Sequence, residues 1–156
     1  PDVDAAVFET ARGGLLREGL AFDRCDVAVV TNIGEGDHLG LNYITTVEDL
    51  AVLKRVIVQN VAPDGMAVLN AADPIVAKMA ENCPGAVTFF AADRHHPVMA
   101  THNAQGKRVV YIDGHSIVCA EGGDVVQRIP LGGVALGGVE SGGVAFNGTA
   151  SDDAAS

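Results

Sequence analysis

The stretch VAVVTNIGEGDHLG, residues 27–40, decides how the rest of the sequence is interpreted. The apolar residues 27–30 predict a buried strand, and the polar residues after them predict an exposed loop at its carboxyl end. In an open α/β sheet, ligands bind at the carboxyl ends of the strands. A loop that carries Asn, Glu, Asp and His at that place is therefore a candidate for metal binding and proton transfer.

On both sides of this loop, short apolar runs alternate with helical patterns. The segment VDAAVFET (residues 3–10) predicts a largely buried strand that ends on Glu9, and Gly13-Gly14 predicts a turn opening a short helix. Thr46 is a good N-cap for a long amphipathic helix, and Asp73 with Pro74 sets the start of another. The predicted strands cover residues 3–10, 26–33, 66–69 and 86–91, and the predicted helices cover residues 11–20, 46–61 and 75–82. This order predicts an α/β fold with a mostly parallel sheet flanked by helices.

After Asp93 the pattern changes to short strands separated by turns. The dipeptide Asp113-Gly114 between strand-like residues is a strong hairpin signal. We expect an α/β body over residues 1–93 and an antiparallel β-meander over residues 94–131, together one domain, 1–131. The strands of the meander are predicted over residues 98–102, 108–112, 116–120 and 125–131.

Residues 132–156 form a glycine-rich end in which Gly-Gly-Val recurs every five residues. A period of five matches neither helix nor strand, and paired glycines are costly to order. We expect a flexible, disordered tail and assign it no chemistry.

Composition excludes several classes of protein. The chain has 156 residues, 48% of them hydrophobic, which is enough for one domain with a sizeable core. Its net charge of -10, from 10 basic and 20 acidic residues, argues against a nucleic-acid surface. No apolar run approaches the ~20 residues of a membrane span. The three cysteines have no disulfide or zinc spacing, which favours reduced thiols in the cytoplasm. The chain starts without methionine, and we expect it to be a piece of a longer protein.

If the predicted strands are parallel, three strand ends bring polar groups to one edge of the sheet. They carry Glu9, the pair Asp37 and His38, and Asn70 with Asp73. For His38, loop capping or a metal-hydrolase site shared with Asp37 is the alternative.

Lys54 lies on the helix that follows the second strand, at the border of its apolar stripe. A lysine that packs its stem on the core and keeps its ammonium group in solvent is the alternative for this position. His95 and His96 are adjacent, so in a strand they would point to opposite faces, and only a loop would let both bind one metal.

Four motifs in order resemble a known family. They are ETARGG at residues 9–14, TNIGEGDHLG at 31–40, the helix that carries Lys54, and VLNAADP at 68–74. Together they resemble the central domain of the Mur-type ATP-dependent amide ligases and, within that family, the cyanophycin synthetases, over roughly residues 1–131. The resemblance implies that ATP phosphorylates a carboxylate and that an amine then attacks the acyl phosphate. In the cyanophycin synthetases this half is associated with adding arginine to the aspartate side-chain carboxylate of the growing polymer.

The resemblance also implies roles for individual residues. Glu9 and His38 match magnesium ligands, and His38 and Lys54 match catalytic positions. Many family members carbamylate the lysine, and an unmodified lysine that reaches phosphate is the alternative. Asn70 and Asp73 match the segment that lies against the adenine and ribose of ATP, although Ala72 replaces an acid of the family's usual run.

The family's phosphate-binding loop, which ends in Gly-Lys-Ser or Gly-Lys-Thr, occurs nowhere in this sequence. We expect it upstream of Pro1, and we expect the chain to be inactive by itself. The alternatives are a non-catalytic metal-binding or assembly module, which includes a homo-oligomer, a fragment of a peptidoglycan or folate-type ligase, and a remnant with no retained role.

Overall fold

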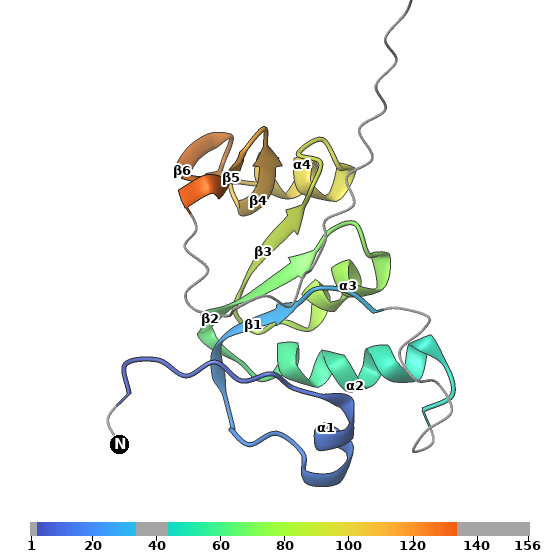
Figure 1. The fold of residues 1–156 in the computed structure, drawn as a ribbon. Coiled ribbons are helices and arrows are strands. Elements are labelled where there is room, and N and C mark those ends of the chain that lie inside the picture. The colour runs from blue at the N-terminus through green and yellow to red at the C-terminus, as the bar shows by residue number, and fades with distance from the viewer. Residues whose placement is uncertain (1–2, 34–43, 134–156) are drawn as a thin grey trace, which may run out of the picture.

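The computed structural model describes residues 3–33 and 44–133. One six-stranded sheet runs in the order β1-β2-β3-β4-β5-β6, so that every strand lies next to its neighbour in sequence (Figure 1). The strands are β1 (Cys25–Val30), β2 (Val61–Asn70), β3 (Ala86–Ala91), β4 (Arg108–Asp113), β5 (Ser116–Glu121) and β6 (Asp124–Pro130). The helices are α1 (Arg12–Glu18), α2 (Val47–Gln59), α3 (Pro74–Lys78) and α4 (Pro97–Ala104), with 3-10 turns η1 (Met79–Asn82) and η2 (Leu131–Gly133).

The sheet has a parallel and an antiparallel part. Strands β1 to β4 are parallel to one another, whereas β4, β5 and β6 pair antiparallel. Helices α2, α3 and α4 make the three crossovers between the parallel strands. The α/β fold with a mostly parallel sheet and an antiparallel addition is therefore confirmed.

The core lies between the three crossover helices and one face of the sheet. Ala28 pairs with Ala67, Val30 pairs with Leu69, and Leu69 pairs with Phe89, so these side chains share a face, and all are buried. The helices contribute Leu50, Val58, Val76, Met79 and Met99 to the same core.

The opposite face of β1 is open to solvent. Val27 and Val29 alternate with the core residues and are 57% and 56% exposed. Successive side chains of a strand point to opposite faces of the sheet. Only the face of β1 that packs against α2 is therefore buried.

The ends of α2 and α3 follow from their capping residues. In α2 the Asp49 amide donates to Thr46 Oγ1 at 3.1 Å, and the Thr46 amide donates to Asp49 Oδ2 at 3.2 Å. This reciprocal capping box satisfies two of the N–H groups that a helix start leaves without partners. The predicted start signals at Thr46 and Asp73 are both confirmed.

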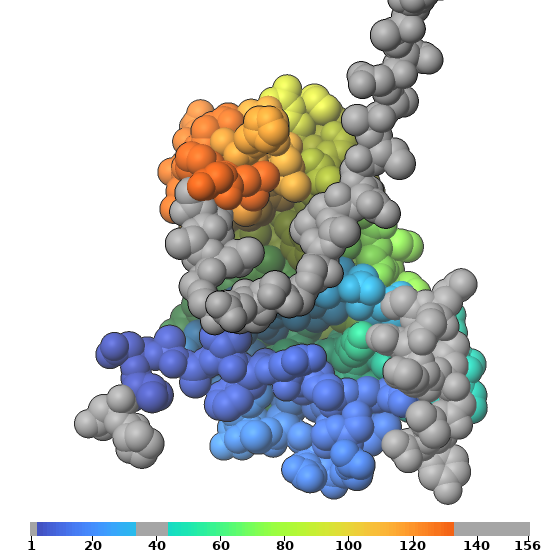
Figure 2. All heavy atoms as spheres, viewed as in Figure 1, coloured from blue at the N-terminus to red at the C-terminus, as the bar shows by residue number. Residues whose placement is uncertain are grey.

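The prediction of a buried strand over residues 3–10 is wrong. This segment is extended but belongs to no strand, with Val7 97% and Phe8 66% exposed. An apolar run becomes a strand only when a neighbour accepts its backbone hydrogen bonds, and the described sheet begins at β1. Figure 2 shows the segment, in dark blue, as a strip on the surface. Its Phe8 ring stacks on Phe22 at a centroid distance of 6.2 Å.

The prediction of a strand over residues 98–102 is also wrong, because these residues lie in α4. Pro97 occupies the first turn, where its fixed φ suits a helix and its missing N–H costs nothing. Met99 and His102, three residues apart, then face the sheet together and are buried. As a consequence β4 follows a helical crossover and pairs parallel to β3.

The remaining differences are local. The turn predicted at residues 63–65 lies inside β2, where the register against β1 is irregular. Gly13 and Gly14 lie inside α1 and form no turn. The hairpin at Asp113-Gly114 is confirmed, with Asp113 paired to Ser116 and Gly114 at a φ of 57°. Of the predicted tail, residues 134–156 lie outside the described residues.

Among the described helices, none has both the length and the apolar character that crossing a bilayer requires.

Candidate functional site

The carboxyl edge of the parallel strands is the place where the sequence predicted a site. Residues 31–33, which follow β1, lie beside residues 70–73, which comprise the last residue of β2 and the three that follow it. The two segments are neighbours because β1 and β2 are parallel and in register up to Val30 and Leu69. Side chains of the second segment bind the main chain of the first.

Asn70 makes the first of these contacts. Its Nδ2 donates a hydrogen bond to the Thr31 carbonyl at 2.8 Å, and its Oδ1 accepts one from the Ala72 amide at 2.9 Å. These two partners fix which end of the side-chain amide is nitrogen. An asparagine amide has two N–H donors and two lone pairs on its oxygen, so within the described residues Asn70 keeps one donor and one acceptor.

That remaining pair has a clear chemical meaning. An asparagine amide that can both donate and accept matches the edge of an adenine base, which presents an amino group beside a ring nitrogen. The adenine contact that the VLNAADP motif implies for Asn70 stays a prediction.

Asp73 makes the second contact between the two segments. The Ile33 amide donates to its Oδ2 at 2.8 Å, while Oδ1 accepts from the amides of Ile75 and Val76 at 2.9 and 3.1 Å. One carboxylate thus caps α3 and holds the segment after β1. The sequence showed the cap, but nothing in it showed the contact with Ile33.

The other predicted site residues lie on different elements. Glu9 is exposed on the unpaired segment 3–10, and Lys54 is half-buried in the middle of α2. His38 and Asp37 lie outside the described residues. The structure thus brings Asn70 and Asp73 together with the end of β1, and the grouping of Glu9, His38 and Lys54 stays a prediction.

Within residues 3–33 and 44–133, no three His, Cys, Asp or Glu side chains converge to hold a metal ion. Mg²⁺ takes oxygen ligands and usually keeps several waters, using only one or two carboxylates of the protein. The exposed carboxylate of Glu9 suits one such ligand position, and the described residues by themselves supply no complete metal site.

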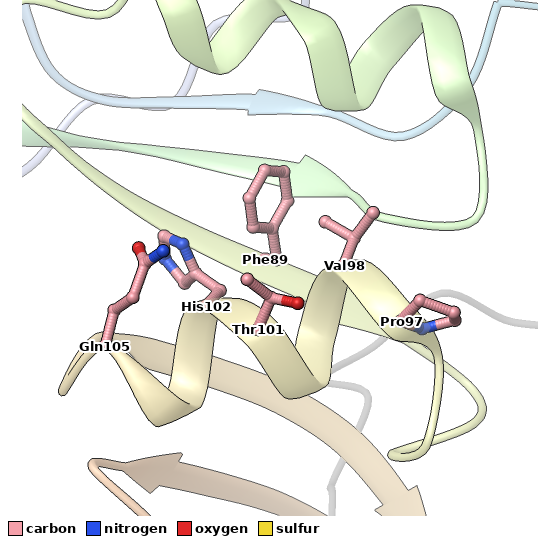
Figure 3. Close-up of a pocket in the computed structure, with 6 residues that line it drawn as sticks. All are labelled: Phe89, Pro97, Val98, Thr101, His102 and Gln105. Carbon is pink, nitrogen blue, oxygen red and sulfur yellow. The ribbon is translucent and has the colours of Figure 1, made fainter.

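A hollow of about 370 Å³ lies beside α4, at residues for which the sequence predicted no site. Figure 3 shows the side chain of Phe89 on β3 and the other lining side chains on α4, with Gln105 directly after the end of that helix. His102 Nε2 lies 2.8 Å from the Val87 carbonyl, and the ring packs edge-on against Phe89 at 4.7 Å. Burial lowers the pKa of His102, against the opposing effect of the hydrogen bond to Val87. Because residues 98–102 were predicted as a strand, this arrangement was not foreseen.

Comparison with known proteins shows to which family the chain belongs. The profile of the Mur ligase middle domain matches residues 1–135.

The chain belongs to the Mur ligase middle domain family.

The curated relatives of this Mur ligase middle domain include three cyanophycin synthetases. That of Geminocystis herdmanii is 49% identical over 116 residues, which are 74% of this chain and 13% of the relative. That of a Synechocystis species is 50% identical over 116 residues, with the same coverage, 74% and 13%. That of a Nostoc species is 42% identical over 130 residues, 83% of this chain and 14% of the relative. The chain thus spans about one seventh of the length of these relatives.

The resemblance to Mur-type ligases and to the cyanophycin synthetases among them, drawn from four short motifs, is confirmed by these matches. The profile match over residues 1–135 includes the segments that carry Glu9, His38, Lys54, Asn70 and Asp73, and it assigns no role to any of these residues.

Proposed function

We propose that this Mur ligase middle domain binds ATP and takes part in phosphoryl transfer in a cyanophycin-synthetase-like amide ligase. The observation that carries the proposal is the carboxyl edge of the sheet, where Asn70 keeps one donor and one acceptor beside the end of β1. The relatives are named cyanophycin synthetases, which supports a ligase of that kind. As the resemblance implies, we propose a side-chain carboxylate of the polymer and arginine as its substrates.

The proposed reaction has two steps. A carboxylate oxygen attacks the γ-phosphorus of ATP, the bond to the bridging oxygen breaks, and ADP leaves. The arginine amine then attacks the acyl carbon, a tetrahedral intermediate forms, and phosphate leaves as the amide forms and the nitrogen loses its proton. Activation is needed because a free carboxylate is a poor electrophile. Bound Mg²⁺ would offset the negative charge on the phosphate oxygens.

The candidate residues take their roles in this proposal from the family motifs. Glu9, on the extended segment 3–10, and His38, in the segment that follows β1, would hold Mg²⁺. Lys54 offers a cation to the phosphates or, if carbamylated, an oxygen ligand to a second metal ion. Asn70 binds adenine, and Asp73 belongs to the same nucleotide-binding segment.

Ligand titration of the chain tests the proposal. We expect ATP to shift the amide resonances of residues 70–73 in NMR spectra and Mn²⁺, as a paramagnetic stand-in for Mg²⁺, to broaden those near Glu9. Glu9→Gln should abolish the broadening, because it removes the charged ligand. Glu18→Gln, an exposed glutamate on α1, is the matched control and should leave it unchanged. Titrations without site-specific shifts or broadening would contradict the proposal.

We further propose that the chain alone does not complete the reaction, because its sequence contains no Gly-Lys-Ser or Gly-Lys-Thr phosphate loop. An arginine-dependent ATP hydrolysis assay should show no turnover. Turnover that disappears in Glu9→Ala would contradict this expectation. A profile of amino-acid substrates on a longer segment would separate the arginine ligase from a peptidoglycan or folate-type ligase.

A second candidate function is a non-catalytic assembly module. The exposed apolar side chains Val7, Phe8, Val27 and Val29 favour it, because apolar surface of this kind is common at protein–protein interfaces. Solution mass measurement with and without Mn²⁺ distinguishes the two functions. A defined oligomer whose metal affinity depends on His38 supports assembly, and a monomer that binds ATP supports the ligase.

We place the protein in the cytoplasm on the basis of its cysteines. Cys25, Cys83 and Cys119 are free thiols in the structure, which suits a reducing compartment. Mass spectrometry of protein alkylated in intact cells would test this placement by counting the free thiols.

A further inference from the structure

We propose that Asp73 is a positioning residue, which acts with Asn70 as a side-chain clamp on the main chain after β1. The inference rests on the proposed function in one respect only, namely that the positioned segment serves the ATP and metal site. The clamp itself is defined by four residues of the described structure, Thr31, Ile33, Asn70 and Asp73.

The clamp begins where the backbone ladder between β1 and β2 ends. The last paired residues are Val30 and Leu69. Beyond them, Asn70 donates to the Thr31 carbonyl and Asp73 accepts from the Ile33 amide, both at 2.8 Å. The first contact uses the carbonyl of Thr31, and the second uses the amide of Ile33, two residues further on. In a parallel sheet, the next pair of backbone hydrogen bonds would use the same two groups. The two side chains therefore extend the pairing past the point where the strands separate.

The Ile33 contact has a structural reason. Ile33 is 7% exposed and packs in the core cluster, so its main-chain N–H needs a partner inside the protein. Asp73 Oδ2 is that partner. Without it, burying the Ile33 side chain would leave its main-chain donor without a hydrogen-bond partner, which destabilises the folded state.

The same bonds limit what Asp73 can give to a ligand. A carboxylate offers about four lone-pair sites, and Ile33, Ile75 and Val76 occupy three of those on Asp73. Asn70 keeps both a donor and an acceptor. We therefore assign direct contact with the nucleotide to Asn70, and assign Asp73 the indirect task of holding residues 31–33 in place.

The clamp also couples two sites. The amide of Asn70 is oriented by Thr31 and Ala72, so the donor and acceptor left for a base point in a fixed direction only while Thr31 is in place. Asp73 holds Ile33, two residues further on. Loss of the Asp73 contact should therefore weaken ATP binding although Asp73 itself does not touch the base.

The test separates the clamp from the helix cap, which also uses Asp73. Asp73→Ser keeps a good N-cap for α3 but is too short to reach the Ile33 amide. We expect the Ile33 amide in Asp73→Ser to exchange with deuterium about tenfold faster, as expected for losing a hydrogen bond to a charged group. The Val76 amide, measured in the same NMR spectra, should keep its protection. The melting temperature should fall by only a few degrees, because one hydrogen bond is lost and the helix cap is kept.

Asp73→Asn is the second variant, because its single acceptor oxygen serves either the cap or Ile33 but not both. It should give an exchange rate at Ile33 or at Val76 between those of the wild type and an unprotected amide. If Ile33 exchanges at the wild-type rate in both variants, the clamp is contradicted.

ATP titration of the same proteins tests the coupling. Asn70→Ala should lose the ATP-induced shifts, and Asp73→Ser should raise the dissociation constant about threefold to tenfold while the shifts at residue 70 persist. An unchanged dissociation constant in Asp73→Ser contradicts the coupling. Failure of the wild type to bind ATP contradicts the proposed function and the coupling with it. Faster exchange at Ile33 in that case still supports the clamp.

Discussion

Residues 3–10 and strand β3 are apolar runs of similar length and composition, but only β3 forms a strand and is buried. In β3 every central residue pairs with β2 on one side or β4 on the other, and Phe89 is 6% exposed. In residues 3–10 no strand is formed, and Phe8 is 66% exposed. The difference lies in the neighbours and not in the local sequence.

This contrast shows what strand formation requires. Apolar residues supply the tendency to leave water, but the backbone groups of an extended segment must be paired before that segment can be buried. For β3 the pairing comes from β2 and β4, which lie on either side. For residues 3–10 the described chain contains no such neighbour.

Truncation of the two phenylalanines is the most direct test of this comparison. Phe89→Ala should reduce the free energy of unfolding by about 3–5 kcal/mol, because it opens a cavity under α4. Phe8→Ala should change it by less than about 0.5 kcal/mol, since Phe8 is mostly in solvent. Urea denaturation measures both. Equal losses would show that residues 3–10 are packed in solution, contrary to the contrast.

Alanine substitutions of two glycines should change the stability of the protein in opposite directions. A Cβ on Gly85, just before β3, would lie 2.4 Å from the Gly65 carbonyl oxygen, so Gly85→Ala should destabilise the protein by about 1–3 kcal/mol. A Cβ on Gly14, in α1, meets nothing within 4 Å. Gly14→Ala should stabilise by about 0.5–1 kcal/mol, because alanine is the better helix former.

Thermal melting measures both variants: the melting temperature should fall in Gly85→Ala and rise in Gly14→Ala. A Gly85→Ala protein as stable as the wild type would show that the amino ends of β2 and β3 can separate at little cost.

The stability of the folded protein should also depend on pH, because His102 is buried against β3. Burial lowers its pKa in the folded state, so between that value and the unfolded pKa of about 6.5 the unfolded chain binds more protons. Stability should therefore fall as pH is lowered from about 7 to 5. Urea denaturation at several pH values should show this fall in the wild type.

His102→Gln should reduce this pH dependence, whereas His115→Gln, at an exposed position, should retain it. If the two variants follow the same pH profile, the neutral buried state of His102 is contradicted.

The smallest effect is expected at the surface pair between Arg128 and Asp113, which join β6 to β4 at 2.8 Å. The hydrogen bond from Arg128 and its charge lower the pKa of Asp113. Because both side chains are nearly half exposed, Asp113→Asn should change the melting temperature little and should lessen its dependence on salt. A large loss of stability would show that the β4–β6 edge depends on this pair.

Much of the fold followed from the sequence because its signals are local. The Asp113-Gly114 turn, the Thr46 cap and the apolar run of β3 each depend on a few adjacent residues, and each was confirmed. Residues 3–10 and α4 were predicted wrongly because their states depend on distant partners. For α4, the burial of Met99 and His102 against the sheet outweighs the strand-like local sequence.

The candidate site shows the same division. The positions of Asn70 and Asp73 at a strand end were predictable from the order of motifs. Their bonds to Thr31 and Ile33 were not, since these bonds join residues 39 and 40 positions apart through side chain and main chain. No local pattern encodes such a contact.

The sequential order of the strands bears on how the protein is made. During synthesis each strand from β2 to β6 leaves the ribosome after the strand that it will pair with, so the sheet can grow one strand at a time. Among the described strands, only β1 has no partner that is made before it. Newly made β1 then presents an edge on which the next strand assembles, and folding can keep pace with translation.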